Sequence, residues 1–230
     1  MTTIKICGIT RLDDATYAAE LGADFLGFIF VPGSPRYIDP KRAAKIISQV
    51  QWAGGKGTRH DGRPIESHPL HCVGVFRNAS TEEIKRVTAI AGNEYVQLHG
   101  DEPDEVVREV GKPVIRSVAV PSGATGSQPV DITTDTRRAE SPSLQIATSA
   151  EWLLFDTGGG TGRAFDWSLM SRVPRSKRFF LAGGLTPDNV AEAIRVVRPD
   201  GVDVSTGVES APGVKDPAKM RKFFDQVRQP

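Results

Sequence analysis

The chain has 230 residues, 39% of them hydrophobic, and its 29 Lys and Arg almost balance 28 Asp and Glu, for a net charge of +1. Such a chain buries about 70% of the surface that its unfolded form exposes, so it can build a core without metals or disulfides. The near-neutral charge argues against electrostatically driven nucleic-acid binding, and the apolar runs are too short to span a membrane. With no leader or transit composition at the N-terminus, we expect a cytoplasmic protein.

The cysteine and histidine content argues against both disulfides and metals. Cys7 and Cys72 are too few for a disulfide framework and indicate a reducing compartment. They fall on predicted strands that are not neighbours, so we expect both thiols to be free. The four histidines lack the spacing of zinc-binding motifs, and we predict no metal site.

Eight short apolar runs, each bounded by turn residues, are predicted to be strands. Most are apolar at both alternating positions, which is typical of parallel strands covered by helices. They span residues 4–7, 25–30, 72–76, 95–98, 114–118, 152–156, 179–182 and 202–205.

Helical patterns follow most of these strands, over residues 13–21, 40–50, 81–91, 103–110, 187–197 and 217–227. The third is preceded by Ser80 with Glu83 three residues later, the spacing of a capping box. Proline opens each of the last three, at a position where its missing N–H is harmless. A strand followed by a helix, repeated along the chain, predicts a parallel sheet.

Two connections between strands are longer than the others. Residues 51–71 are rich in Gly, His and Pro, and residues 121–150 are rich in Ser and Thr. We interpret both as insertions within one domain that spans residues 1–230, because the strand rhythm resumes after each. The predicted fold is a single (βα)8 TIM barrel, since eight units close a barrel; an open doubly wound sheet is the alternative.

In a TIM barrel the chemistry lies at the carboxyl ends of the strands. Cys7 ends the first strand on the same face as Lys5, whose charge would lower the pKa of a functional thiol; the alternative is a small buried apolar residue. Arg36 follows the second strand in a loop stiffened by Pro and Gly, which suits capture of a carboxylate or phosphate. Asp156 ends the sixth strand, where a carboxyl must be paired, cap a turn or act as an acid.

Glycines and small hydroxyl residues follow the last two strands, where many barrels bind phosphate through backbone N–H groups. Tight turns are the alternative explanation. The residues are Gly183, Gly184, Ser205, Thr206 and Gly207. A second glycine-rich stretch, 158–162, lacks the pattern of a nucleotide-binding loop, and we interpret it with Arg163 as a lid or a phosphate contact.

Eight motifs together resemble the phosphoribosylanthranilate isomerase family of tryptophan biosynthesis. In chain order they are KICGIT (5–10), GFIFVPGSPRYI (27–38), VGVF (73–76), VQLHGDE (96–102), LLFDT (153–157), FDW (165–167), LAGGLTPDNV (181–190) and GVDVSTGVESAPGVKD (201–216). The resemblance covers most of the chain, and the combination of the first motif with the last two is specific to that family.

The resemblance implies a (βα)8 barrel that converts N-(5'-phosphoribosyl)anthranilate to 1-(2-carboxyphenylamino)-1-deoxyribulose 5-phosphate, without a cofactor and as a monomer. On this chain Asp156 would be the general acid and Cys7 the general base. Arg36 would bind the anthranilate carboxylate, with Asp203 nearby to orient polar groups. The phosphate would be held by Gly183, Gly184, Ser205, Thr206 and Gly207.

Two other functions stay open from the residues alone. A related phosphosugar isomerase barrel would be expected to carry a carboxylate in place of Cys7, or diphosphate and metal ligands. A non-catalytic barrel that kept only the phosphate site is the second alternative. The roles of His99 and of the segments 51–71 and 121–150 are not assigned at this level, and for Arg163 the choice between a lid and a phosphate contact stays open.

Overall fold

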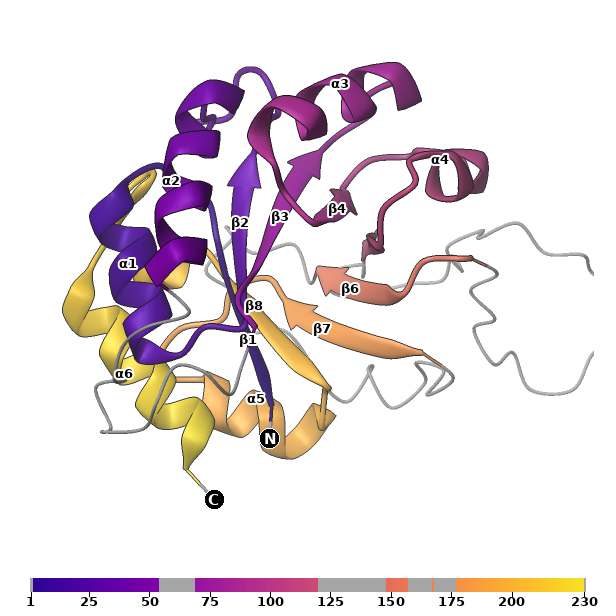
Figure 1. The fold of residues 1–230 in the computed structure, drawn as a ribbon. Helices are drawn as coiled ribbons and strands as arrows, with labels where there is room; N and C mark the ends of the chain where they lie inside the picture. Colours follow the sequence, from indigo (N-terminus) through magenta and orange to yellow (C-terminus); the bar gives the residue numbers. More distant parts are fainter. Residues whose placement is uncertain (1, 54–68, 120–147, 157–166, 168–176, 230) are drawn as a thin grey trace, which may run out of the picture.

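In the computed structural model, eight parallel strands of the described residues pair in chain order, and the last pairs with the first to close a barrel (Figure 1). The structure describes residues 2–53, 69–119, 148–156, 167 and 177–229. The strands are β1 (Thr3–Cys7), β2 (Phe25–Ile29), β3 (His71–Phe76), β4 (Tyr95–Leu98), β5 (Val114–Ala119), β6 (Trp152–Asp156), β7 (Arg178–Ala182) and β8 (Gly201–Val204). The predicted TIM barrel is confirmed, and the open doubly wound sheet is wrong.

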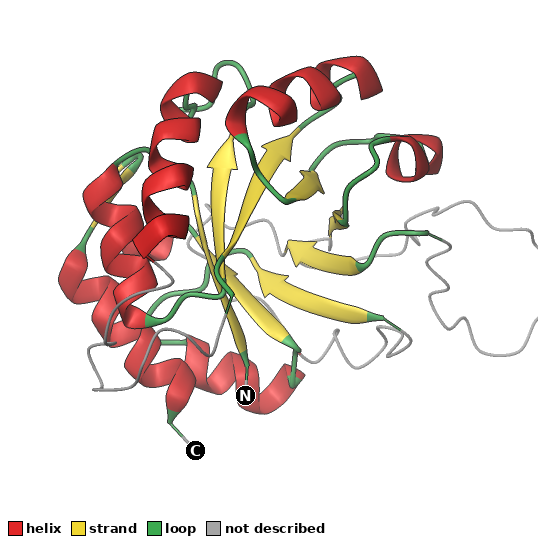
Figure 2. Cartoon of the chain, in the orientation of Figure 1, coloured by secondary structure: helices red, strands yellow, loops and turns green. Residues whose placement is uncertain are grey.

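Helices cover the outside of the barrel (Figure 2). They are α1 (Leu12–Leu21), α2 (Pro40–Ala53), α3 (Thr81–Ala91), α4 (Asp104–Glu109), α5 (Val190–Val197) and α6 (Pro217–Arg228). A short two-stranded sheet, β9 (Glu209–Ala211) with β10 (Val214–Lys215), follows a 3₁₀ turn after β8. None of the described helices is long and apolar enough to cross a membrane.

The helix starts test the predicted capping signals. The Ser80 side chain accepts a hydrogen bond from the backbone N–H of Glu83, which confirms the predicted cap of α3. Of the three helices predicted to begin with proline, only α6 does, at Pro217. Pro187 lies in a turn that the Asn189 side chain closes by accepting from the N–H of Thr186, so α5 begins later than predicted.

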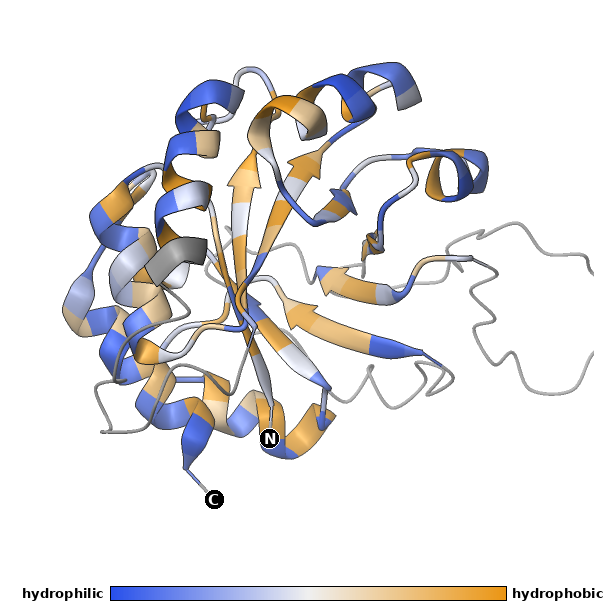
Figure 3. Cartoon of the chain, in the orientation of Figure 1, coloured by the Kyte–Doolittle hydropathy of each residue, from blue (hydrophilic) through white to orange (hydrophobic). Residues whose placement is uncertain are grey.

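The core has two parts, separated by the sheet. The larger lies between the outward-facing strand residues and the helices, and the apolar sides of those helices pack against the barrel (Figure 3). The smaller is an apolar plug inside the barrel, in which Trp152 stacks on Phe180 with ring centroids 4.5 Å apart. Because this plug fills the lower interior, the polar interior residues lie above it, toward the carboxyl ends of the strands.

The two predicted insertions lie mostly outside the described residues. At their described margins the predicted boundaries are wrong, because residues 51–53 continue α2 and His71 already belongs to β3. The glycine-rich stretch 158–162 and Arg163 also lie outside the described residues. Cys7 and Cys72 are both buried and free, as expected from their positions.

Candidate active site

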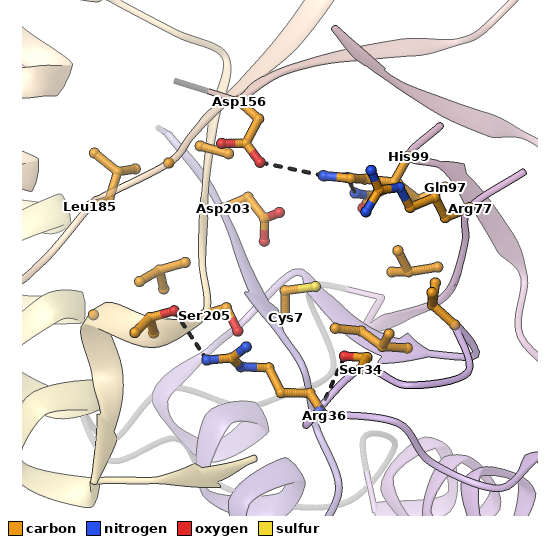
Figure 4. Close-up of a pocket in the computed structure, with 18 of the residues that line it drawn as sticks. Cys7, Ser34, Arg36, Arg77, Gln97, His99, Asp156, Leu185, Asp203 and Ser205 are labelled. Carbon is orange, nitrogen blue, oxygen red and sulfur yellow. Dashed lines mark hydrogen bonds and ion pairs between the residues drawn. The ribbon is translucent and has the colours of Figure 1, made fainter. Parts of the chain in front are cut away.

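A cavity of about 770 Å³ opens at the carboxyl ends of the strands (Figure 4). It is lined by the residues to which the family resemblance gives catalytic and substrate-binding roles. These are Cys7, Arg36, Asp156, Gly183, Gly184, Asp203, Ser205, Thr206 and Gly207. Residues separated by up to 200 positions therefore meet in one place because each follows a strand of the same barrel.

A buried ion pair forms the floor of the cavity. Lys5 Nζ donates to Asp203 Oδ2 at 2.9 Å, and the Lys5 side chain is fully buried. Burial lowers the pKa of Lys5 and is the largest single effect, but the charges and hydrogen bonds of Asp203 and Cys7 together outweigh it, and the pKa lies above its ordinary value. The second oxygen of Asp203, Oδ1, is buried without a partner among the described residues. The pair therefore leaves one unpaired acceptor on a residue that lines the cavity.

Cys7 ends β1, two residues after Lys5. Burial raises the pKa of the Cys7 thiol, and although Lys5 and Lys215 lower it, Asp203 adds to the increase and the net pKa is above its ordinary value. The sequence-based expectation that Lys5 favours the thiolate is therefore correct in direction, but burial has the larger effect. In the unliganded protein Cys7 is a neutral thiol.

We expect Cys7 to react slowly with iodoacetamide at neutral pH, because the thiolate is the nucleophile. Below a raised pKa the thiolate fraction grows about tenfold per pH unit, so the rate should still be rising at the ordinary thiol pKa of 9.0. Mass spectrometry of a Cys72→Ala variant measures the rate at Cys7 alone. A rate that levels off below pH 8 would contradict the raised pKa.

Arg36 is held by a network that the sequence analysis missed. Its Nε and Nη2 donate to Glu209 at 2.8 and 2.7 Å, and Nη2 also donates to Thr206 Oγ1 at 3.2 Å. Buried Lys215 donates to Glu209 Oε1, the oxygen that also accepts from Arg36 Nε, at 3.0 Å, and to the carbonyl of Cys7 at 2.6 Å. The network joins the ends of β1 and β8 to the loop after β2.

The charges of this network are nearly compensated. Burial raises the pKa of Glu209, but the hydrogen bonds and charges of Arg36 and Lys215 together lower it by more. The net pKa is below its ordinary value, so Glu209 stays ionised. Two cations and one anion leave a net charge of about +1 beside the cavity. Among the described residues Arg36 Nη1 has no hydrogen-bond partner, and it is the nitrogen through which a substrate anion can be bound.

The loops after β7 and β8 form one end of the cavity. Gly183 and Gly184 have φ values of +84° and +67°, a backbone conformation that side chains disfavour. A Cβ on Gly207 would lie 1.9 Å from the carbonyl oxygen of Leu185, so the two loops approach too closely for any other residue. The Ser205 hydroxyl is buried without a partner among the described residues. These features favour a small anion at this end.

Three further residues line the wall opposite these loops: Arg77, Gln97 and His99 (Figure 4). Gln97 Nε2 lies 3.0 Å from His99 Nδ1, and His99 Nε2 lies 3.4 Å from Asp156 Oδ2. The Asp156 side chain is 31% exposed and reaches the cavity from β6. The signal that would have found Gln97 and His99 is their alternation in the motif VQLHG, which puts Gln97 on the inner face of β4 and His99 just after the end of that strand.

A closed (βα)8 barrel whose cavity joins a thiol, a carboxyl and two glycine-rich loops has the architecture of an acid–base enzyme that acts on a small phosphorylated molecule. Among the described residues, no group of His, Cys, Asp and Glu is arranged to hold a metal ion.

A family model described as N-(5'-phosphoribosyl)anthranilate (PRA) isomerase matches residues 4–226. The N-(5'-phosphoribosyl)anthranilate isomerase of Xanthomonas campestris is 41% identical over 235 residues, covering 99% of this chain and 93% of the relative. The chain therefore belongs to the N-(5'-phosphoribosyl)anthranilate isomerase family, which confirms the resemblance, and with it the isomerase activity, predicted from the motifs.

Solved structures agree with this assignment. The phosphoribosylanthranilate isomerase of Thermus thermophilus has a TM-score of 0.76 at 33% identity, covering 98% of each chain. A phosphoribosylanthranilate isomerase in complex with reduced 1-(o-carboxyphenylamino)-1-deoxyribulose 5-phosphate has a TM-score of 0.71 at 32% identity, covering 99% of each chain. The alternative of a non-catalytic scaffold is not favoured.

Proposed function

We propose that the cavity converts N-(5'-phosphoribosyl)anthranilate to 1-(2-carboxyphenylamino)-1-deoxyribulose 5-phosphate, with Asp156 as general acid and Cys7 as general base. The observation that supports these roles is that both side chains face one cavity that ends in the glycine-rich loops after β7 and β8. The reaction needs one group that gives a proton and another that takes one, and a carboxyl and a thiol supply both.

The first step opens the ribose ring. Asp156 donates its proton to the ring oxygen, the bond between C1' and that oxygen breaks, and the lone pair of the anthranilate nitrogen forms a C1'=N iminium. Asp156 is left as a carboxylate. The step needs a protonated carboxyl that reaches the cavity, and the partly exposed position of Asp156 at the end of β6 meets the second requirement.

The second step moves a proton from carbon. The Cys7 thiolate removes the C2' proton, the electron pair forms the C1'=C2' bond, and the iminium nitrogen becomes neutral. The resulting enolamine then loses the proton of its C2' hydroxyl and gains one at C1', which gives the ketone. The raised pKa of Cys7 in the free protein makes the thiolate a strong base, and the positive iminium beside it favours its formation.

Binding uses the two ends of the cavity. The phosphate lies against Gly183, Gly184, Ser205, Thr206 and Gly207, where backbone N–H groups are the donors. Arg36 binds the anthranilate carboxylate through Nη1, because its other nitrogens are engaged by Glu209 and Thr206. The free Oδ1 of Asp203 accepts a hydrogen bond from a ribose hydroxyl. No cofactor takes part in these steps.

The test is a direct assay of the purified chain. N-(5'-phosphoribosyl)anthranilate is generated in situ, and the loss of its fluorescence is followed on addition of the protein. We expect the rate of loss to be proportional to protein concentration and the product to match 1-(2-carboxyphenylamino)-1-deoxyribulose 5-phosphate by mass. Absence of turnover would reject the proposed activity and support a binding or scaffold role.

We further infer that residues 1–230 act as a single domain, as a monomer in the cytoplasm. Both cysteines of the chain are free, which fits a reducing compartment. The large hydrophobic side chains that are exposed among the described residues, such as Tyr37 and Val196, occur singly and require no partner. The only partner that the proposal needs is the small-molecule substrate.

A further inference from the structure

Glu209 contacts Arg36 but does not line the cavity, and the reaction scheme above gives it no role. Its two oxygens accept from Nε and Nη2 of Arg36 at 2.8 and 2.7 Å, in the bidentate geometry of a strong carboxylate–guanidinium pair. The Glu209 side chain is 4% exposed, so water hardly competes with this pair. This edge of the guanidinium is therefore closed to a substrate, and Thr206 engages Nη2 further, so Nη1 is the nitrogen left to bind one.

The remaining contacts of Glu209 fix its charge and that of Lys215. Oε1 of Glu209 also accepts from Lys215 Nζ at 3.0 Å and from the backbone N–H of Gly213 at 3.2 Å. Every contact of this carboxyl group within the described residues is with a donor, which requires the ionised form. Lys215 Nζ also donates to the carbonyls of Cys7 and Ser205, at 2.6 and 3.2 Å. Three acceptors need three N–H groups, so Lys215 is an ammonium.

These residues connect Arg36 to the strand end that carries the proposed base. Glu209 and Lys215 are partners across the hairpin of β9 and β10. A Cβ on Gly8 would lie 2.7 Å from Cδ of Arg36, so the Arg36 side chain runs directly across the residue that follows Cys7 (Figure 4). Arg36 is therefore held at its stem by the backbone beside the base and at its head by Glu209.

We propose that Glu209 and Lys215 are positioning residues for substrate binding. Glu209 fixes the guanidinium of Arg36 so that Nη1 is presented to the anthranilate carboxylate. Lys215 balances the charge of Glu209 and joins it to the backbone of Cys7, so that Arg36 keeps its place relative to the base. The inference rests on the proposed roles of Arg36 and Cys7.

A double-mutant cycle tests whether Glu209 acts through Arg36. Glu209→Gln keeps the size of the side chain and removes its charge, and it should raise KM about fivefold or more, because Arg36 is no longer held for the carboxylate. The value of kcat should change less, since the proposed acid and base are untouched. Arg36→Met should raise KM by more, and adding Glu209→Gln to it should change KM by less than about twofold.

A purely structural role of Glu209 predicts a different result. The increase in KM caused by Glu209→Gln would then be the same with Arg36 present and with Arg36→Met, and this outcome would refute the positioning role. A fall in kcat with unchanged KM would refute it as well. Glu151→Gln is the matched control, because it removes the carboxylate of another Arg–Glu pair, with Arg178, and should leave KM and kcat unchanged.

Alkylation of Cys7 tests the role of Lys215 without any catalytic assay. The charged groups that face Cys7 are Lys5 on its own strand, Asp203 on β8, Lys215 on β10 and Arg36 after β2. In a Cys72→Ala background, Lys215→Met removes one of these cations and should slow the reaction with iodoacetamide at neutral pH at least about threefold. Loosened packing would have the opposite effect, because burial is the largest cause of the raised pKa of Cys7.

Two further variants keep this measurement decisive. Lys177→Met is the matched control, because Lys177 Nζ also donates to a backbone carbonyl, that of Ala150, at 2.9 Å; it should leave the alkylation rate unchanged. If Lys215→Met does not fold, because it leaves Glu209 buried without a cation, the double variant with Glu209→Gln removes both charges and gives the same test.

These outcomes separate the inference from the activity itself. Unchanged or faster alkylation of Cys7 in folded Lys215→Met would overturn the role of Lys215, while leaving the isomerase assignment intact. An inactive wild type would reject the proposed function, and the alkylation rates would still report whether Lys215 acts on Cys7.

Discussion

Replacing either Cys7 or Asp156 by alanine should lower kcat at least about 100-fold, the scale of removing a general base or acid. Each side chain faces the cavity from a different strand, β1 and β6, so one substitution leaves the other group in place. The assay is the in situ fluorescence measurement, run at saturating substrate so that a change in substrate binding does not affect the measured rate. Unchanged turnover in either variant would exclude the role assigned to that residue.

Matched controls exist for both substitutions. Cys72→Ala removes the second thiol of the chain, which is buried on β3 and does not line the cavity. Asp101→Ala removes an exposed carboxylate from the loop after β4. Both controls should retain nearly wild-type kcat. If Cys72→Ala were as damaging as Cys7→Ala, the loss would reflect folding, and circular dichroism of the variants would show it.

The two catalytic variants should also differ in the step that fails. Asp156→Ala blocks ring opening, so the closed-ring substrate should persist on the protein. Cys7→Ala still allows ring opening by Asp156. The C2' proton of the bound substrate should nevertheless not exchange with solvent deuterium, because no base removes it. Exchange at the wild-type rate in Cys7→Ala would assign the base to another group.

The barrel and its catalytic edge could be predicted because both depend on local patterns. Strand ends are visible as apolar runs that stop at turn residues, and in a parallel barrel every strand end lies at the same rim. Cys7 and Asp156 were therefore placed together from position alone. Pro187 misled the prediction of a helix start, because the Asn189 side chain closes a turn there that local propensity does not reveal.

The network behind the site could not be predicted in this way. Lys215 donates to the carbonyl of Cys7, 208 residues earlier, and its spacing to Glu209 carries no known signature. The raised pKa of Cys7 also depends on how much water the folded chain excludes, which is a property of the packed barrel. Residue types at strand ends indicate candidates, but their charge states require the three-dimensional neighbours.

The buried pair Lys5 and Asp203 should give the largest stability effect of a single substitution. Asp203→Ala leaves the ammonium of Lys5, which is fully buried, without its ion-pair partner, and such losses cost about 3–5 kcal/mol. Because the pKa of Lys5 is raised in the fold, the pair stabilises the protein fully below the ordinary value of 10.5 and loses this contribution as the pH rises through the folded value. Urea unfolding at pH 7 therefore measures the whole effect.

The double variant Lys5→Met with Asp203→Leu tests whether the loss comes from the stranded charge. Removing both charged groups should recover most of the stability, since apolar residues of similar size often replace a buried ion pair at little cost. Arg178→Ala is the control, because its ion pair with Glu151 is largely exposed and should contribute less than about 1 kcal/mol. If the free energy of unfolding of Asp203→Ala lay within about 1 kcal/mol of the wild-type value, Lys5 would have another partner or access to water. The floor of the cavity would then not be the dry ion pair described above.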